Sequence, residues 1–189
     1  MTKKSKIILV SLVFLFTTVF ASACSFGDQE NTSYNIYVPN SGEGTVSVIN
    51  SITREVDNVL KVGDTTSHGV AVTLDNKYLF TGDLDDGNIY VVDAGINEIV
   101  KTIEVGERTH GIDMSPDGKY VLVAAGRGGG PFLAVIDTEL QEVVAVIEDS
   151  LVGPTHMSFS PDGKRAYVAD PEQNAVGVVD MVSLKTETV

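Results

Sequence analysis

Three histidines recur at matching places in the sequence and are the residues best suited to chemistry. His68, His110 and His156 each lie six or seven residues before an aspartate that stands in a predicted turn. Imidazole nitrogen binds zinc, copper, nickel and iron, so three imidazoles brought together could ligate a metal ion or the iron of a haem. Whether they come together depends on the elements that carry them.

These elements repeat with a period of about 43 residues. Ser115-Pro116-Asp117-Gly118 lies between two runs of strand-forming residues, which predicts a tight β-hairpin. Ser160-Pro161-Asp162-Gly163 repeats this turn, and Thr73-Leu74-Asp75-Asn76 is a weaker copy. A further strand of the unit ends once per repeat at an Asn or Asp: Asn50, Asp93, Asp137 and Asp180.

The repeat predicts an all-β fold. Each unit holds about four short strands, no stretch after the amino-terminal segment has a helical period, and this pattern is typical of β-propeller blades. The predicted repeats span 34–63, 64–106, 107–153 and 154–189. The first unit lacks an innermost strand, so we expect 15 strands, or about 3.75 blades. Propellers typically close with about 4–8 blades, so we interpret these residues as a partial ring of a longer propeller.

The repeat resembles the YVTN family of β-propellers, which is related to the YncE-like and surface-antigen propellers. The matching residues are Ile36–Asn40, Val46–Asn50, His110-Gly111 and the Ser-Pro-Asp-Gly turns, and the resemblance extends from Ile36 to Val189. It implies a propeller fold but no particular activity. The family pattern carries histidine at the His110 position without a metal, whereas some relatives with comparable repeats bind haem d1 or metals through channel histidines.

The spacing of the third histidine differs by one residue. His110 precedes Asp117 by seven residues and His156 precedes Asp162 by six, so Thr155 rather than His156 matches His110. A one-residue offset turns a strand side chain to the opposite face unless a bulge restores it. We therefore interpret the histidines as structural positions of the repeat, with a metal or haem site as the alternative.

Two further residues of the same predicted face could contact a ligand. Asp113 lies on a predicted inner strand, where a carboxylate could bind a cation or act as a base. We expect it instead to hydrogen-bond a neighbouring blade. Arg127 lies in the glycine-rich loop Gly126–Pro131 and could hold an anion. That loop lacks the Gly-Lys-Ser/Thr ending of a phosphate-binding loop.

The first 23 residues have the pattern of a signal peptide. Lysines come first and the apolar stretch from Ile7 to Phe20 is short for a spanning helix. Ala21-Ser22-Ala23-Cys24 resembles a bacterial lipobox, which implies cleavage before Cys24 and lipid attachment to it. The alternatives are an ordinary signal peptide cleaved after Ala23 and an uncleaved anchor. Residues 24–33 then form the lipidated cysteine and a polar tether. Cys24 is the only cysteine, so no disulfide forms within one chain.

The chain carries a formal net charge of −13. Nucleic acids and anionic lipids require basic surfaces, so neither is expected as a partner, and membrane contact is expected through the lipid on Cys24 alone. No nucleophile motif is present, and no catalytic residue is assigned. The sequence predicts an exported, lipid-anchored propeller on the extracytoplasmic side of the cell membrane. It would bind or scaffold an envelope protein or a small ligand, and no cofactor is firmly implied. The alternative is a metal-binding or haem-binding, oxidoreductase-type propeller that uses the histidines.

Overall fold

A computed structural model describes residues 32–106, 108–125 and 132–189. These residues form fifteen strands in four antiparallel sheets, together with the short 3-10 turn η1 (Ser41–Glu43). The first sheet has three strands and each of the others has four, with neighbours in chain order. The strands are β1 (Asn35–Asn40), β2 (Thr45–Asn50), β3 (Val56–Lys61), β4 (Val70–Val72), β5 (Tyr78–Gly82), β6 (Asn88–Asp93), β7 (Glu98–Glu104), β8 (Ile112–Met114), β9 (Tyr120–Ala124), β10 (Leu133–Asp137), β11 (Glu142–Ile147), β12 (Met157–Phe159), β13 (Arg165–Asp170), β14 (Ala175–Asp180) and β15 (Lys185–Thr188).

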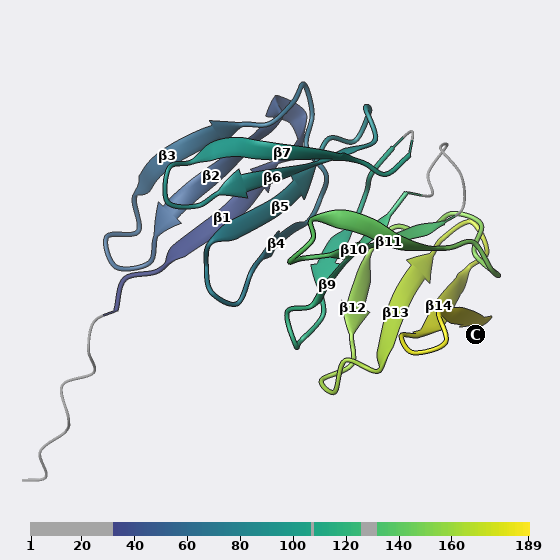
Figure 1. Ribbon diagram of the computed structural model, residues 1–189. Helices are drawn as coiled ribbons and strands as arrows, with labels where there is room; N and C mark the ends of the chain where they lie inside the picture. The colour runs from purple at the N-terminus through teal and green to yellow at the C-terminus, as the bar shows by residue number, and fades with distance from the viewer. Residues whose placement is uncertain (1–31, 107, 126–131) are drawn as a thin grey trace, which may run out of the picture. The chain divides into compact units, whose positions relative to one another are not determined.

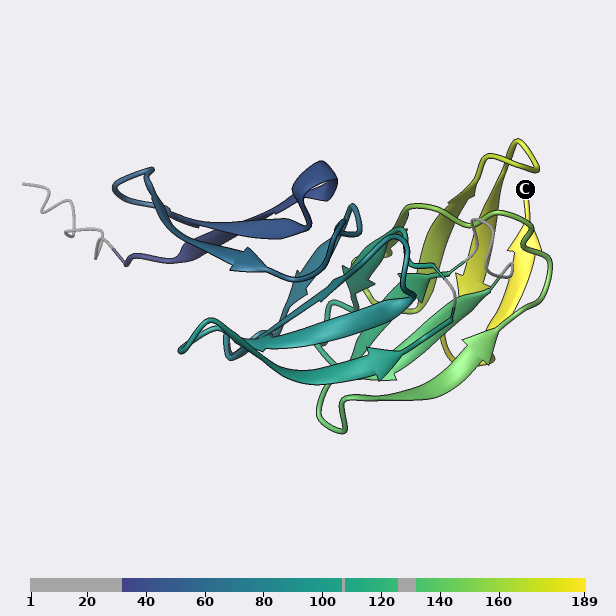
Figure 2. The ribbon, with the colours of Figure 1, turned by 90° about the horizontal axis from the view of Figure 1, so that it is seen from above.

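The four sheets are consecutive blades of a β-propeller, which we number blades 1 to 4. The inner strands β4, β8 and β12 have only three residues each; β4 contacts β8, and β8 contacts β12. The blades follow one another in chain order, with the purple first sheet and the yellow last sheet at opposite ends of the row (Figures 1 and 2). For the residues that the structure describes, the predicted all-β fold, the count of fifteen strands and a first blade of three strands are thus confirmed.

Some sequence predictions concern residues outside the described part of the chain. They are the signal peptide Met1–Ala23, Cys24 and most of the tether that follows it, and Arg127 with the rest of the loop Gly126–Pro131. In the part that the structure does describe, no helix is long and apolar enough to cross a membrane.

The hydrophobic core lies between blades. One cluster joins blades 1 and 2 through Val46, Leu60 and Leu79, and a second joins blades 2 and 3 around Phe80. A third joins blades 3 and 4 around Leu122. Burying apolar surface contributes roughly 25 cal/mol per Å², and a blade can bury both of its faces only if it has a neighbour on each side. Each blade is therefore stabilised mainly by the blades beside it.

Glycine lets the inner backbones of consecutive blades approach closely. The His68 N–H donates to the His110 carbonyl oxygen at 2.9 Å, which joins blades 2 and 3 directly. A Cβ on Gly69 would lie 2.6 Å from the Ile112 backbone. A Cβ on Gly111 would collide with the Thr155 carbonyl oxygen of blade 4. A residue with a side chain at either glycine would force neighbouring blades apart.

Two buried aspartates hold the segments that lead into the inner strands. Asp83 accepts hydrogen bonds from the Thr65 hydroxyl at 2.5 Å and the Thr65 N–H at 3.2 Å. Asp170 accepts them from the N–H groups of Val152 at 2.7 Å and Gly153 at 3.0 Å. Burial raises the pKa of each carboxyl group, but the hydrogen bonds outweigh it, so both pKa values lie below the usual aspartate range.

We expect Gly111→Ala to lower the free energy of unfolding by about 1–3 kcal/mol, because the added methyl overpacks the contact between blades 3 and 4. Chemical denaturation of the full chain measures the change. Gly42→Ala is the matched control, since nothing lies within 4 Å of a Cβ at Gly42. Equal stability of the two variants would mean that the blades do not touch at Gly111.

We expect Asp170→Asn to lower the free energy of unfolding by about 1–3 kcal/mol at neutral pH, because an amide replaces a carboxylate that accepts three backbone hydrogen bonds, from Val152, Gly153 and Gln173. The pKa of Asp170 is lower in the folded chain than in the unfolded chain. Its stabilisation is therefore full above the ordinary aspartate pKa of about 3.9 and is lost as the pH falls through the lower, folded value. Denaturation curves measured against pH should show less acid dependence in the variant than in the parent.

The exposed turn residue Asp180 provides the control for this experiment. Its carboxylate accepts bonds only within its own turn, from Val182 and Ser183. Asp180→Asn should therefore change stability less than Asp170→Asn. The reverse order would contradict the role given to Asp170.

Candidate functional site

The three histidines lie in the segments that lead into the inner strands, and not in the strands themselves. His68 and His110 are each two residues before β4 and β8, and His156 is directly before β12. Backbone hydrogen bonds confirm that Thr155 occupies the position in blade 4 that His110 occupies in blade 3, as the sequence alignment of the repeats predicted. The His110 N–H donates to the carbonyl oxygen of Ala124 in β9, as the Thr155 N–H does to that of Ala169 in β13.

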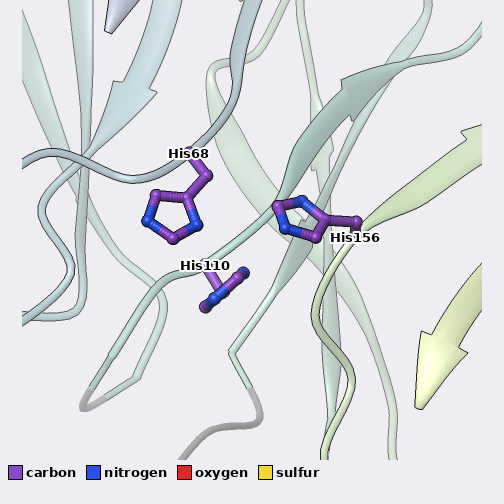
Figure 3. Close-up of side chains that lie close together, drawn as sticks. All are labelled: His68, His110 and His156. Carbon is purple, nitrogen blue, oxygen red and sulfur yellow. The ribbon is translucent and has the colours of Figure 1, made fainter. Parts of the chain in front are cut away.

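The three imidazoles nevertheless converge, so the expectation from the one-residue offset is wrong. The ring centroids of His68 and His110 are 4.5 Å apart, and those of His110 and His156 are 4.8 Å apart, both edge to face. His68 and His156 lie nearly parallel at 5.6 Å. Figure 3 shows the rings reaching toward one another from three separate segments. One nitrogen from each ring can be chosen so that all three lie within 4.8 Å of one another.

Two physical features explain this convergence. Side chains along an inner strand alternate between the preceding and the following blade, so the pleat decides which neighbour they face. The histidines precede the strands and are not bound by that alternation. In addition, Gly111 lets the backbone of blade 4 approach blade 3, where a Cβ would lie 3.0 Å from the His156 Cα. The close approach brings the His156 ring to the other two.

The cluster has a buried base and an exposed opening. His110 is 8 % exposed, whereas His68 and His156 are exposed to solvent. Thr109 secures the His110 segment, because its hydroxyl donates to the Asp83 carbonyl oxygen of blade 2 at 2.6 Å. The cluster thus combines one fixed imidazole with two that have room to adjust.

A cavity of about 220 Å³ adjoins the cluster. It is lined by His68, His110 and Thr109 together with Leu84 of blade 2 and an ion pair. In that pair an Arg108 guanidinium nitrogen lies 2.9 Å from an Asp85 carboxylate oxygen. Both side chains are about half exposed, so the pair contributes little to stability. It places one positive and one negative charge beside the imidazoles.

Asp113 lies outside the cluster. It pairs with Leu122, whose side chain packs between blades 3 and 4, and its carboxylate accepts a hydrogen bond from the Met114 N–H at 2.9 Å. Burial raises the pKa of Asp113, partly offset by hydrogen bonds from Met114 and from Phe159 of blade 4. Asp113 therefore faces the neighbouring blade, as the sequence predicted. Arg127, the remaining predicted contact, lies outside the described residues.

Chemically, the cluster suits a directly bound metal ion. In a tetrahedral site with metal–nitrogen bonds of about 2.0–2.1 Å, two imidazole nitrogens lie about 3.4 Å apart. The three nitrogens here lie within 4.8 Å of one another, which is farther apart than in such a site. Rotation of the exposed His68 and His156 rings could shorten these distances to those that a metal ion requires. Three imidazole ligands also leave a fourth position open, which is typical of catalytic rather than structural zinc sites.

Sequence reasoning missed the residues that surround the imidazoles. Asp85, Arg108 and Thr109 were not identified as candidate site residues from the sequence. The one available signal was that Arg108 and Thr109 directly precede His110. Their partners are on blade 2, more than twenty residues away in the sequence.

The comparisons with known proteins are consistent with this architecture. The chain is similar to a solved structure of hydrazine synthase from Kuenenia stuttgartiensis, with 26 % sequence identity and a TM-score of 0.72. The similarity covers 82 % of this chain and 46 % of that chain, so this chain spans less than half the length of the matched one. The comparison with curated proteins gives no match.

A family match covers most of the described chain. The sequence matches the family described as Cytochrome D1 heme domain over residues 32–150, which include blades 1 to 3 and two of the three histidines, His68 and His110. The match agrees with a propeller built from repeated blades. The chain belongs to the Cytochrome D1 heme domain family.

Proposed function

We propose that the protein binds a first-row transition-metal ion through the imidazoles of His68, His110 and His156. The observation that carries this proposal is the convergence of three imidazole nitrogens from blades 2, 3 and 4 to within 4.8 Å. Imidazole suits zinc, copper, nickel and iron, and geometry and availability decide which of these is bound. When bound, such an ion can polarise a ligand or activate water in its open position.

The family also implies a haem, and the described residues fit it less well than an ion. The three rings lie 4.5–5.6 Å apart, which leaves no room for a macrocycle between them. The adjoining cavity of about 220 Å³ is smaller than the roughly 300–1,000 Å³ of most small-molecule sites. Because of the family match, the iron of a haem is the second candidate for the metal that the imidazoles bind.

The chain's own residues would determine how the ion is held and how its binding affects the stability of the fold. His110, held through the neighbouring Thr109, would provide a fixed ligand, and the exposed rings would close around the ion. Imidazole binds a metal only in its neutral form, so binding would release protons and weaken on acidification. Because each ligand comes from a different blade, the ion would link three blades and stabilise the folded chain.

Zinc binding to the full chain tests the proposal. We expect one Zn²⁺ per chain by equilibrium dialysis with elemental analysis, and a higher melting temperature with Zn²⁺ than with chelator. His156→Asn should weaken binding about 100-fold or more, because even changes outside the ligand shell cost about 10–100-fold. His156 is exposed, so this variant should still fold.

Asp113→Asn provides the matched control, since this residue lies in β8, three residues after His110, but outside the cluster. It should bind Zn²⁺ like the parent chain. Equal Zn²⁺ affinity of the parent and His156→Asn would refute the imidazole site. A stoichiometric Soret absorption band in purified protein would instead assign the metal to haem.

We also propose that the propeller is exported and anchored to the outer side of the cell membrane by lipid on Cys24. The support is the amino-terminal sequence alone: a basic start, a short apolar stretch and a lipobox-like ending. The propeller would then serve as a binding or scaffolding module at the envelope, with the histidine face as its contact surface for an envelope protein or a small ligand.

Cys24→Ala should abolish incorporation of labelled fatty acid and release the protein from membranes or leave it unprocessed. Ser25→Ala, at the neighbouring position, is the control and should keep the label. Membrane fractionation with metabolic labelling measures both. Undiminished lipid labelling of Cys24→Ala would rule out this anchor, because the chain has no other cysteine.

A further inference from the structure

One edge of the blades carries apolar side chains at the tips of its turns. Because neighbouring strands are antiparallel, the turn between the last two strands of each blade lies at the same edge of the sheets as the turn that follows each inner strand. The segments that hold the three histidines lie at the opposite edge. We call the first surface the turn face, defined by its exposed apolar side chains: Ile52, Leu74, Ile96, Leu140 and Val182.

Four of these side chains project from copies of one turn. Each copy begins at an Asn or Asp whose side-chain oxygen accepts hydrogen bonds from two backbone N–H groups of the turn. It ends at a residue with positive φ. The tip between them carries Ile52, Ile96, Leu140 or Val182. The repeated turn therefore holds one apolar side chain per blade outward in a defined position.

The exposure of these tips does not come from a missing neighbour. Blades 2 and 3 have a packed blade on each side, yet Ile96 and Leu140 are 61 % and 59 % exposed. The tips project from the edges of the sheets, whereas neighbouring blades cover the faces. Turns favour Gly, Asn, Asp, Ser and Pro, so Ile, Leu and Val at successive tips favour a surface that meets an apolar environment.

The chain enters the propeller at this same face. The Tyr34 carbonyl oxygen, directly before β1, accepts a hydrogen bond from the Ser51 N–H at 3.0 Å. The Tyr34 N–H in turn donates to the Ser51 hydroxyl at 3.0 Å. Ser51 belongs to the turn that carries Ile52. The residues that follow Cys24 thus lead into the propeller beside an apolar tip of the turn face.

We propose that the turn face rests on the membrane that holds the lipid of Cys24, with its apolar tips in the interfacial layer of the bilayer. This inference rests on the proposed lipid anchor and adds a second membrane contact to it. Nine residues separate Cys24 from Tyr34, and nine residues span at most about 30 Å when fully extended. So short a connection keeps the turn face at a high effective concentration beside the bilayer, where a weak apolar contact suffices.

The opposite orientation would stretch the tether to its limit. β1 has six residues and runs away from the turn face, which takes the chain about 20 Å at 3.3 Å per residue. The loops at both edges add to the height of the blade. If the histidine segments faced the bilayer, the tether would therefore have to be almost fully extended, at a cost in conformational entropy.

The distribution of charge favours the same orientation. Most of the basic residues in the described part of the chain lie in the turns of the turn face or directly after them: Arg54, Lys77, Lys119, Lys164, Arg165 and Lys185. The loops of the opposite edge gather acidic residues instead, among them Asp64, Asp83, Asp85, Asp86, Glu148 and Asp149. Turns of the turn face also contain aspartates, so apolar side chains and not net charge attraction would hold this face to the bilayer.

This orientation would direct the histidine cluster away from the membrane. The exposed rings of His68 and His156 would open to the aqueous phase. The site would then take its ion, and any partner, from solution and not from the lipid.

Depth-dependent quenching on vesicles tests the proposal. The full-length lipoprotein with one added cysteine is labelled with an environment-sensitive thiol dye and reconstituted into phosphatidylcholine vesicles. The lipid on Cys24 protects that sulfur from the dye. Ile96→Cys and Leu140→Cys each place the dye on the turn face. We expect both dyes to be quenched by nitroxide-labelled lipid and to lose most of their quenching by aqueous iodide.

Val152→Cys is the matched control, because Val152 is an exposed apolar residue in the segment that leads to His156. Its dye should be quenched by iodide and not by nitroxide-labelled lipid. A further sample combines Leu140→Cys with Ile96→Asp and Val182→Asp. The two added charges should restore iodide quenching of the dye, while the lipid still holds the chain on the vesicles.

Flotation of the vesicles separates this inference from the anchor. A chain that floats but whose turn-face dyes stay open to iodide would overturn the orientation and leave the anchor standing. Quenching of the Val152→Cys dye by nitroxide-labelled lipid would place the opposite face on the bilayer. Loss of iodide quenching without nitroxide quenching would show that protein covers the turn face. A chain that does not float would overturn the anchor and the orientation with it.

Discussion

Burial of sheet faces between consecutive blades is the constraint on which this structure depends. Each of the three hydrophobic clusters lies between two blades, around Leu79, Phe80 and Leu122 respectively. The inner backbones must touch for these faces to meet, and the glycines at 69 and 111 permit it. No side chain of the inner strands β4 and β8 is exposed. The segments before the inner strands, in contrast, carry the exposed side chains of His68 and His156.

The position of the candidate site follows from this difference between the inner strands and the segments that precede them. His68, His110 and His156 lie in the segments that blade packing leaves available, and the close approach of the backbones brings their rings within 5.6 Å of one another. Packing also orders the surroundings: Thr109 bonds to the blade before it, and Asp83 holds the segment that contains His68.

Local patterns in the sequence were sufficient to predict most of the fold. The Ser115–Gly118 turn forms as expected, with the Ser115 hydroxyl donating to the Asp117 carboxylate at 2.6 Å, and Asp162 repeats the arrangement. The strand order follows from repeated hairpins and needs no long-range information. Asp113 was predicted to hydrogen-bond a neighbouring blade from its place on an inner strand, and its carboxylate interacts with the Phe159 backbone of blade 4.

The direction of His156 could not be predicted in the same way. The alignment of Thr155 with His110 was correct, yet the rule of alternating side chains does not apply before a strand begins. The position of the ring depends on how closely blade 4 approaches Gly111, which is a tertiary distance. The same holds for the Arg108–Asp85 pair, whose members come from different blades.

X-ray absorption spectroscopy of the Zn²⁺-loaded full chain addresses the central claim, three imidazoles on one ion, most directly. Our account predicts a first shell that includes three nitrogen ligands at about 2.0–2.1 Å, with the outer-shell scattering of three imidazole rings. His156→Asn should lower that imidazole count. A first shell of oxygen atoms without imidazole scattering would contradict the account, and would show that the convergence of the three histidines serves the packing of the blades alone.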